Sequence, residues 1–332
     1  MGTTVDQTAA TAFSPARFQP GVWIRYAVSL AVLGSVLWLA TPPGARSAVQ
    51  VNSAAGGSGF QVVAAENFWG NIAAQEAGNR AQVTSLIANP NADPHAYEPQ
   101  AADARTVAAA NYVILNGAGY DPWGQKLLAA NPVAGRRVLI VADLVGKREG
   151  DNPHLWYNPA YVRRVAVQIT ADYQRLDPAD AAYFGRQHTH FVQVALKPYF
   201  REISRIAHAY HGVTVGATES IFEYLASALR LHLITPPGFM KAMSEGTEPI
   251  AQDRASFDQQ VAQHRITVLV FNRQNATPDV TSLESKAVLQ GIPIVPLTET
   301  LAPASASFQA WQVSQLNALA RALARVGGRR TR

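Results

Sequence analysis

Two loops of this sequence hold a histidine directly after a proline, among carboxylates and amides. The first loop, NADPHAYEP, carries His95, and the second, GDNPHLWYNP, carries His154. Proline locks its own φ and drives the residue before it into an extended shape, so each histidine stands on a stiff loop. The repetition predicts that the two imidazoles are directed at one common target.

Two glutamates occupy matching positions in the second half of the chain. Glu219, in VGATESIFEYL, lies at the turn between a predicted strand and a predicted helix, and Glu299, in IPIVPLTETL, follows the last predicted strand. In open parallel sheets, ligands bind outside the carboxyl ends of the strands. Both histidines also follow predicted strands, so the four side chains converge if the two halves of the chain face each other.

Two imidazoles and two carboxylates form a ligand set for a divalent first-row metal ion. The carboxylates offset the double charge of the ion, and this matters because an uncompensated charge in a buried cleft is costly. Oxygen ligands favour manganese or iron(II), whereas the Irving–Williams order favours zinc at equal availability. The pattern therefore predicts one bound Zn²⁺, Mn²⁺ or Fe²⁺, with affinity falling below about pH 6 because a coordinating imidazole must be neutral.

Plain structural explanations exist for each of the four residues. A loop histidine is commonly solvated, Glu219 suits the positive end of a helix dipole, and Glu299 suits an exposed turn. The paired proline–histidine loops and the matched strand ends favour the metal role for the set. The other six histidines show no such pattern, and the sequence contains no HExxH, GxSxG or Walker-type motif.

The composition indicates a folded protein without nucleic-acid chemistry. Its 332 residues are 48% hydrophobic and 15% charged, enough for two domains with a large core. No cysteine is present, which excludes disulfides, cysteine–zinc sites, a thiol nucleophile and a lipid-modified cysteine. The net charge of +5 comes from scattered basic residues, without the aromatic and arginine stripe of a nucleic-acid binder, so no nucleic-acid partner is expected.

Residues 1–57 are predicted to be a signal peptide or anchor followed by a flexible tether. The uncharged run at 26–40 follows an arginine and precedes small residues, which is the layout of a secretory signal. It is shorter than the ~20 residues of a spanning helix, so cleavage near Ser47 or Ala48 is favoured over an uncleaved anchor. The glycine-rich segment 52–59 is the tether. We therefore expect export to the periplasm or the cell exterior.

The remaining chain predicts an α/β protein with two parallel-sheet lobes joined by a long helical spine. Short apolar strands alternate with helices at 58–177 and again at 213–328, the pattern of parallel sheets with helical crossovers. The predicted strands are 60–66, 82–88, 112–117, 137–142, 213–217, 231–235, 267–272 and 292–297. Residues 178–212 form the linking helix, which Pro198 should bend or break. The metal site is then expected in the cleft between the lobes.

Five segments carry a family resemblance: DPHAYEP, NGAGYDPW, NPHLWYNP, ATESIFEY and VPLTETL. In this order they resemble the metal-ion solute-binding proteins of ABC importers, the zinc/manganese class, over nearly all of 60–326. The resemblance implies two α/β lobes around a rigid linking helix, with the metal between them. Its first two ligand histidines match His95 and His154.

The third and fourth ligands of that family fall on glutamates. The third is histidine in typical zinc binders and glutamate in typical manganese binders, and it matches Glu219. The fourth, commonly aspartate, matches Glu299, whose longer arm leaves its denticity open. Two features of relatives are missing: the loop 145–153 has no histidine-rich stretch, and there is no lipid-anchoring cysteine.

A capture protein that performs no chemistry is the function that this resemblance implies. It would bind one divalent ion outside the membrane, as a monomer, and pass it to an ABC permease and its ATPase, with membrane contact through the permease or an uncleaved anchor. A secreted metal-dependent hydrolase is an alternative, with Glu66 as its general base or as a hydrogen-bond partner of the ligands. A metal-binding extracellular adhesin on the same fold is another.

Overall fold

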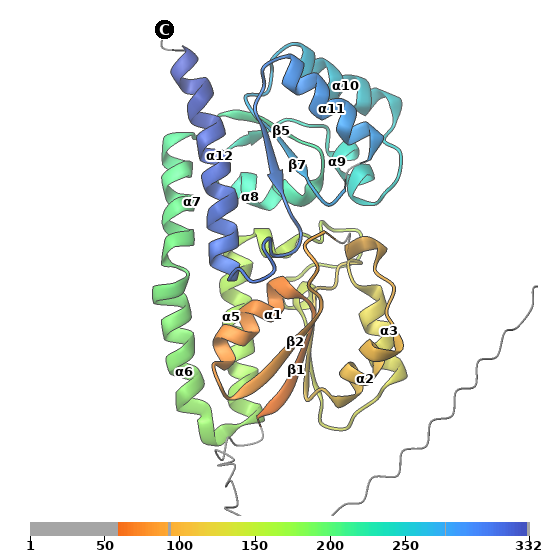
Figure 1. Ribbon diagram of the computed structural model, residues 1–332, viewed down its shortest axis with the longest axis vertical. Helices are drawn as coiled ribbons and strands as arrows, with labels where there is room; N and C mark the ends of the chain where they lie inside the picture. The colour runs from red at the N-terminus through yellow and green to blue at the C-terminus, as the bar shows by residue number, and fades with distance from the viewer. Residues whose placement is uncertain (1–58, 92–93, 276, 331–332) are drawn as a thin grey trace, which may run out of the picture. The chain divides into compact units, whose positions relative to one another are not determined.

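The computed structural model describes residues 59–91, 94–275 and 277–330, so the predicted leader and most of the tether lie outside the described residues. Two parallel four-stranded sheets form the described part, in the orders β2-β1-β3-β4 and β6-β5-β7-β8 (Figure 1). The strands are β1 (Phe60–Glu66), β2 (Ala81–Ile87), β3 (Tyr112–Leu115), β4 (Arg137–Ile140), β5 (Thr214–Ala217), β6 (His232–Leu233), β7 (Leu269–Asn272) and β8 (Ile294–Leu297). The predicted α/β fold with two parallel-sheet lobes is confirmed.

Helical crossovers connect the strands, as parallel pairing requires. In the first lobe these are α1 (Asn67–Ala77), α2 (Ala101–Ala109) and α3 (Pro122–Ala130), and the short α4 (Val141–Val145) and α5 (Pro159–Leu176) follow the last strand. In the second lobe they are α8 (Glu223–Ala228), α9 (Pro237–Ser244), α10 (Ala251–Ala262) and α11 (Pro278–Leu289), and α12 (Phe308–Arg330) ends the described chain. Single 3₁₀ turns stand at Pro94–Ala96, Leu155–Tyr157, Pro178–Asp180 and Ser220–Phe222. The helices α4 and α9 were not predicted from the sequence, and β4 ends two residues earlier than expected because α4 begins at once.

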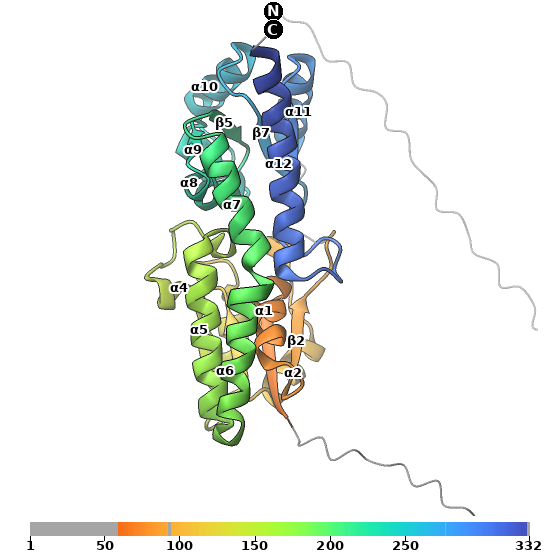
Figure 2. The same cartoon turned by 90° about the vertical axis from the view of Figure 1, so that its left-hand side faces the viewer.

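The spine is two helices joined by a π-helical turn rather than one helix. It consists of α6 (Ala181–His190), a π segment (Phe191–Ala195) and α7 (Lys197–Ala209). The amide of Leu196 donates to the carbonyl of Phe191, five residues back, at 2.9 Å. Pro198 has no N–H for the carbonyl four residues before it, and the wider turn accommodates this gap. Figure 2 shows α6 beside the first lobe and α7 beside the second.

The two lobes share one hydrophobic core. The cluster of buried side chains that contains Val62 and Ile114 of the first sheet continues to Val215 and Leu297 of the second. The segment that leads from β8 into α12 also bonds to the first lobe: the amide of Leu301 donates to Asn67 Oδ1 at 3.2 Å, and that of Phe308 to Asn71 Oδ1 at 2.7 Å. Because apolar and polar contacts both cross the boundary, the lobes are held in a fixed relation.

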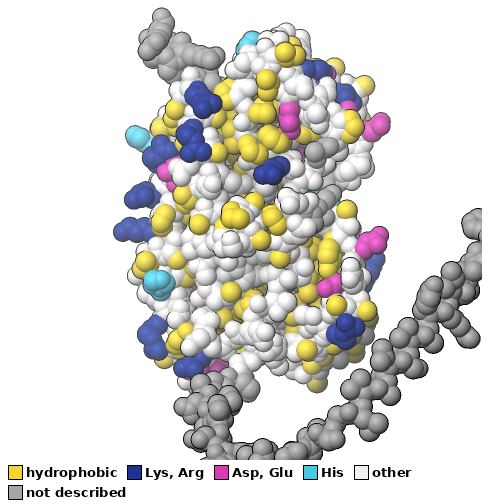
Figure 3. Space-filling model, in the orientation of Figure 1, with side chains coloured by type: hydrophobic (Ala, Val, Ile, Leu, Met, Phe, Trp, Pro, Cys, Tyr) yellow, Lys and Arg dark blue, Asp and Glu magenta, His cyan; other side chains and the backbone are white. Residues whose placement is uncertain are grey.

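Basic side chains gather on the spine. Figure 3 shows Lys and Arg side chains along its left edge, where α6 and α7 lie in Figure 1. The exposed basic residues of these two helices are Arg186, Lys197, Arg201 and Arg205. The basic residues are thus less scattered than the linear sequence suggests. Within the described residues, every helix falls short of the length or the apolar character that crossing a bilayer needs.

The shared core predicts that metal loading changes the shape of the molecule little. We expect small-angle X-ray scattering curves of the metal-free and metal-loaded chain to overlay, with lobe displacements of about 1 Å or less. A clear decrease in the radius of gyration on loading would contradict a rigid spine.

Candidate metal centre

His154 is buried and is oriented by a neighbouring amide. Its Nδ1 lies 2.9 Å from Asn152 Oδ1, which also accepts the backbone N–H of His154 at 3.0 Å. Asn152 is fixed in turn, because its Nδ2 donates to the carbonyl of Ser220 at 2.7 Å and to Glu223 Oε2 at 2.8 Å in the other lobe. A proton on Nδ1 leaves the lone pair on Nε2, and His154 Nε2 is buried without a hydrogen-bond partner among the described residues. This is the arrangement of a metal-binding imidazole whose second nitrogen is anchored.

His95 supplies the second imidazole from the 3₁₀ turn after β2. Its Nε2 lies 3.3 Å from Glu299 Oε2, with the histidine side chain 28% exposed and the glutamate side chain 1% exposed. Ligands of a tetrahedral ion at about 2.1 Å bond length stand roughly 3.4 Å apart. The observed separation therefore suits two atoms that share a cation.

Both glutamates are buried in the second lobe and share one amide. Glu219 follows β5 and Glu299 follows β8. Counting backbone and side chain together, Glu219 is 1% exposed and Glu299 is 0% exposed. Asn272 Nδ2, at the end of β7, donates to Glu219 Oε2 at 3.0 Å and to Glu299 Oε1 at 2.6 Å. Glu219 Oε1 is buried with no hydrogen-bond partner among the described residues.

The structure brings three of the four predicted residues within metal-binding distance. His95, His154 and Glu299 each offer one ligand atom, and these atoms lie within 4.8 Å of one another. Glu219 is outside that set but is joined to Glu299 through Asn272. The two orphaned acceptors, His154 Nε2 and Glu219 Oε1, are what a divalent cation would satisfy.

The electrostatics of the cluster favour a cation. Burial lowers the pKa of His154 to about 3, so this imidazole is neutral and ready to coordinate across the physiological range. Burial opposes the charge of Glu299, yet the neighbouring His95 lowers the pKa of this carboxyl to about 2. Burial, followed by the charge of Glu299, raises the pKa of Glu219 to about 8. Without an ion, the carboxylate pair thus retains a proton at neutral pH.

Aromatic side chains pack against the two imidazoles. Trp156 stacks on Phe68 with ring centroids 3.9 Å apart, and Tyr120 meets Trp156 edge-on. The hydroxyl of Tyr120 donates to Glu299 Oε2 across the lobes. Gly117, at φ +76°, turns the loop that carries Tyr120, and a Cβ there would lie 2.6 Å from Ile140 Cγ2. Trp156 is completely buried, so its indole is a packing group.

A cavity of about 520 Å³ leads from solvent to His95. Its lining comes from both lobes, including Gly119 of the first and Asn275 of the second. The acidic residues Glu149, Asp151 and Glu245 also line it, and none of the described lysines or arginines does. The opening is therefore electrostatically favourable for an approaching cation.

Glu66, the last residue of β1, is remote from solvent. It is fully buried, and burial followed by the charge of Asp121 raises its pKa well above the ordinary value. It does not line the cavity that reaches His95. A general base at this position would therefore have no direct access to a substrate in that cavity.

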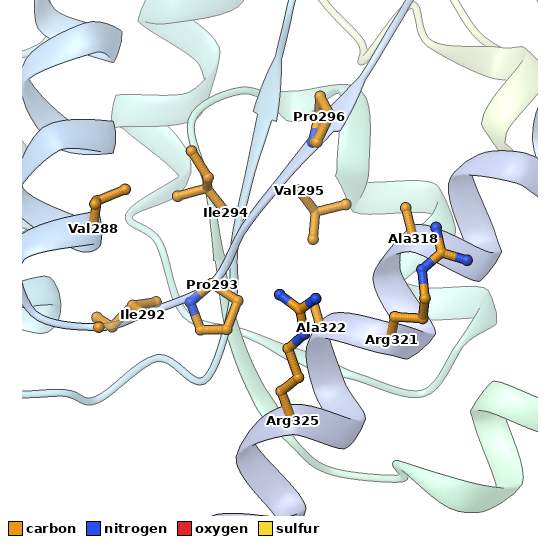
Figure 4. A pocket seen from close by; sticks show the side chains of 11 residues that line it. Val288, Ile292, Pro293, Ile294, Val295, Pro296, Ala318, Arg321, Ala322 and Arg325 are labelled. Atoms are coloured by element: carbon orange, nitrogen blue, oxygen red, sulfur yellow. The ribbon is translucent and has the colours of Figure 1, made fainter.

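A separate cavity, of about 420 Å³, lies between β8 and α12 (Figure 4). Apolar residues such as Ile294 and Val295 line it together with Arg321 and Arg325, and it has no lining residue in common with the metal centre. Arginine has no lone pair for a metal ion, so this cavity is no second metal site.

Sequence reasoning missed the residues that orient the ligands. Tyr120 lies in the family motif NGAGYDPW, and Asn152 lies in the histidine loop GDNPHLWYNP. Asn272 ends the predicted strand 267–272, so the rule that ligands gather at carboxyl ends of strands could have found it. The side chain of Asn272 is a carboxamide, which is neither ionisable nor an imidazole, so its residue type alone does not indicate a metal site.

Comparison with known proteins places the chain among metal-binding proteins. The family model described as zinc-uptake complex component A, periplasmic, matches residues 62–322. A manganese-binding lipoprotein MntA of Halalkalibacterium halodurans is 28% identical over 131 residues, 39% of this chain and 43% of that protein. The metal ABC transporter substrate-binding lipoprotein FimA of Streptococcus parasanguinis is 28% identical over 137 residues, 36% of this chain and 44% of that protein. These matches span less than half the length of either curated relative.

Solved structures share the fold. A manganese-bound mutant of a periplasmic metal-binding protein from Candidatus Liberibacter asiaticus superposes with a TM-score of 0.68 at 16% identity, covering 80% of this chain and 99% of that one. A crystal structure of ZnuA gives 0.64 at 22% identity, covering 78% and 98%. The laminin-binding adhesin Lmb of Streptococcus agalactiae, a mutant structure, gives 0.65 at 16% identity, covering 80% and 100%. At these identities the likeness establishes the fold.

The raised pKa of Glu219 predicts how metal affinity depends on pH. Because the metal-free carboxyl holds a proton below about pH 8, an ion must displace it, so affinity should fall about tenfold per pH unit between pH 8 and pH 6. Calorimetric titration in buffers with different ionisation enthalpies would measure the released proton. Since His154 is neutral throughout this range, the loss begins above the pH 6 expected from imidazole alone. Equal affinity at pH 6 and pH 8 would contradict the assignment of the proton.

The anchoring of His154 predicts an effect of Asn152→Ala. Loss of the amide frees the imidazole to change tautomer and rotate, so metal affinity should fall about 10- to 100-fold. Tyr224→Phe is the matched control, because Tyr224 donates only to the backbone carbonyl of Asn152, at 3.0 Å. Equal metal affinities for the two variants would show that the side chain of Asn152 does not orient the ligand.

Proposed function

Since the chain belongs to the family of zinc-uptake complex component A, we propose that it captures a divalent transition-metal ion outside the membrane and delivers it to an ABC permease. The observation that carries the proposal is the meeting of His95, His154 and Glu299 at the boundary of the lobes, with Glu219 beside them. The ion is cargo, held by residues of both lobes and released to the next protein.

Burial of the site suits tight binding. His154, Glu219 and Glu299 have almost no exposed surface, so an ion held there exchanges its water shell for protein ligands. The two carboxylates supply the charge that a Zn²⁺, Mn²⁺ or Fe²⁺ ion needs in a medium of low dielectric constant. His95, the partly exposed member, is the only one of the four that lines the solvent cavity, so an entering ion would meet it first.

Capture fits this site better than catalysis. With Glu219 as the fourth ligand, no open position would remain for an activated water, and Glu66 is buried and does not line the solvent cavity. A pure adhesin has less support, because the adhesin Lmb shares only the fold with this chain. The secretory layout of residues 26–40 and the periplasmic description of the family support action outside the cytoplasmic membrane.

Ligand removal tests the proposal. His95→Ala or Glu219→Ala should reduce zinc and manganese affinity by more than the roughly 10- to 100-fold typical of outer-shell changes, with little effect on folding. Competition titration against a chromophoric chelator would measure the affinities, and circular dichroism the fold. His208→Ala, on the exposed face of α7, is the matched control. Unchanged affinity in both ligand variants would refute the site.

A further inference from the structure

We propose that Asn272 is a specificity-determining positioning residue, which limits each glutamate to one metal-facing oxygen and so holds the site at four ligand atoms. This inference rests on the proposed function, because it concerns which ion the same site accepts. Asn272 itself is no ligand. It acts through the two carboxylates that its amide group binds.

The sheet order places Asn272 between the glutamates. In the second sheet β7 lies between β5 and β8, and the carboxyl ends of these three strands lead to Glu219, Asn272 and Glu299 respectively. A side chain at the end of the middle strand can reach both neighbours, whereas neither neighbour can replace it. Asn272 is completely buried, so its hydrogen bonds are made without competition from water.

The orientation of the amide is fixed by the backbone. Asn272 Oδ1 accepts the N–H of Gln274 at 3.0 Å, and a backbone N–H can only donate. The Nδ2 group therefore faces the carboxylates, and its two protons match the two acceptors at 3.0 and 2.6 Å. Gln274 supports the same geometry, since its Oε1 accepts the N–H of Glu299 at 2.6 Å.

Each carboxylate thereby has one oxygen bound to Asn272 and one oxygen that Asn272 leaves free of its hydrogen bonds. In Glu219, Oε2 is bound to Asn272, and the buried Oε1 has no hydrogen-bond partner among the described residues. In Glu299, Oε1 is bound to Asn272, and Oε2 faces His95 Nε2 and the hydroxyl of Tyr120. For either carboxylate to chelate with both oxygens, its hydrogen bond to Asn272 would have to lengthen or break.

The number of ligand atoms decides which ion is favoured. Two imidazole nitrogens and two single carboxylate oxygens suit the tetrahedral preference of Zn²⁺. Mn²⁺ prefers octahedral, oxygen-rich coordination, which this residue set could approach only if the glutamates became bidentate. Asn272 therefore favours zinc at a site whose two glutamates would otherwise favour manganese.

The experiment compares the chain with Asn272→Ala, Asn272→Leu and Asn111→Ala. Leucine fills nearly the volume of the asparagine without a donor, which covers the case in which the alanine variant fails to fold. Asn111 is the matched control, because its Oδ1 accepts the N–H of Gln61 at the amino ends of the strands, opposite the site. Zinc and manganese affinities are measured by competition titration, and the zinc environment by X-ray absorption.

We expect the ratio of zinc to manganese affinity to fall about 10- to 100-fold in the Asn272 variants and to stay unchanged in Asn111→Ala. X-ray absorption should show about four light atoms around zinc in the unmodified chain and more in the variants. An unchanged ratio, even with weaker binding of both ions, would overturn the proposal, as would a six-coordinate zinc in the unmodified chain. Failure of the unmodified chain to bind either ion would instead refute the proposed function.

Discussion

The burial of two carboxylates side by side is the constraint on which this structure depends. Glu219 and Glu299 have almost no contact with water, and like charges in a medium of low dielectric constant repel strongly. The protein partly offsets this repulsion through the amide of Asn272, the imidazole of His95 and the hydroxyl of Tyr120. The offset is incomplete, because Glu219 Oε1 and His154 Nε2 remain buried without hydrogen-bond partners among the described residues. A divalent cation bound as proposed would complete the balance, which a neutral solute would not.

The same constraint accounts for the contacts between the lobes. Tyr120 and His95 reach Glu299 from the first lobe, and Asn152 of that lobe bonds to Ser220 beside Glu219. In addition to these polar contacts, the lobes share a continuous apolar core, and the spine runs along both of them. Because the lobes are fixed to each other, the proposed ligand atoms are already ordered without an ion, so little ordering entropy would oppose binding.

The two lobes use similar strand ends for different purposes. Each has a glutamate and an asparagine at the carboxyl ends of two neighbouring central strands, Glu66 and Asn116 in the first sheet and Glu219 and Asn272 in the second. In the first lobe Asn116 Oδ1 accepts from the buried indole of Trp69, and burial followed by the charge of Asp121 raises the pKa of Glu66. In the second lobe Asn272 Nδ2 donates to Glu219 Oε2. The surroundings of these residues, rather than their type, distinguish the two pairs.

The sequence by itself determined the α/β alternation, the two lobes, the linking helices and the three residues His95, His154 and Glu299 that the structure brings together. These follow from local patterns: apolar runs of strand length, proline-stiffened loops, and polar side chains placed just after strands. Only the tertiary structure decided the strand order that sets Asn272 between two carboxylates, the π turn before Pro198, the basic surface of the spine and the raised pKa of Glu66. The physical reason is that hydrogen-bond partners and pKa values depend on which segments meet and how deeply they are buried, and neither spacing nor composition encodes that.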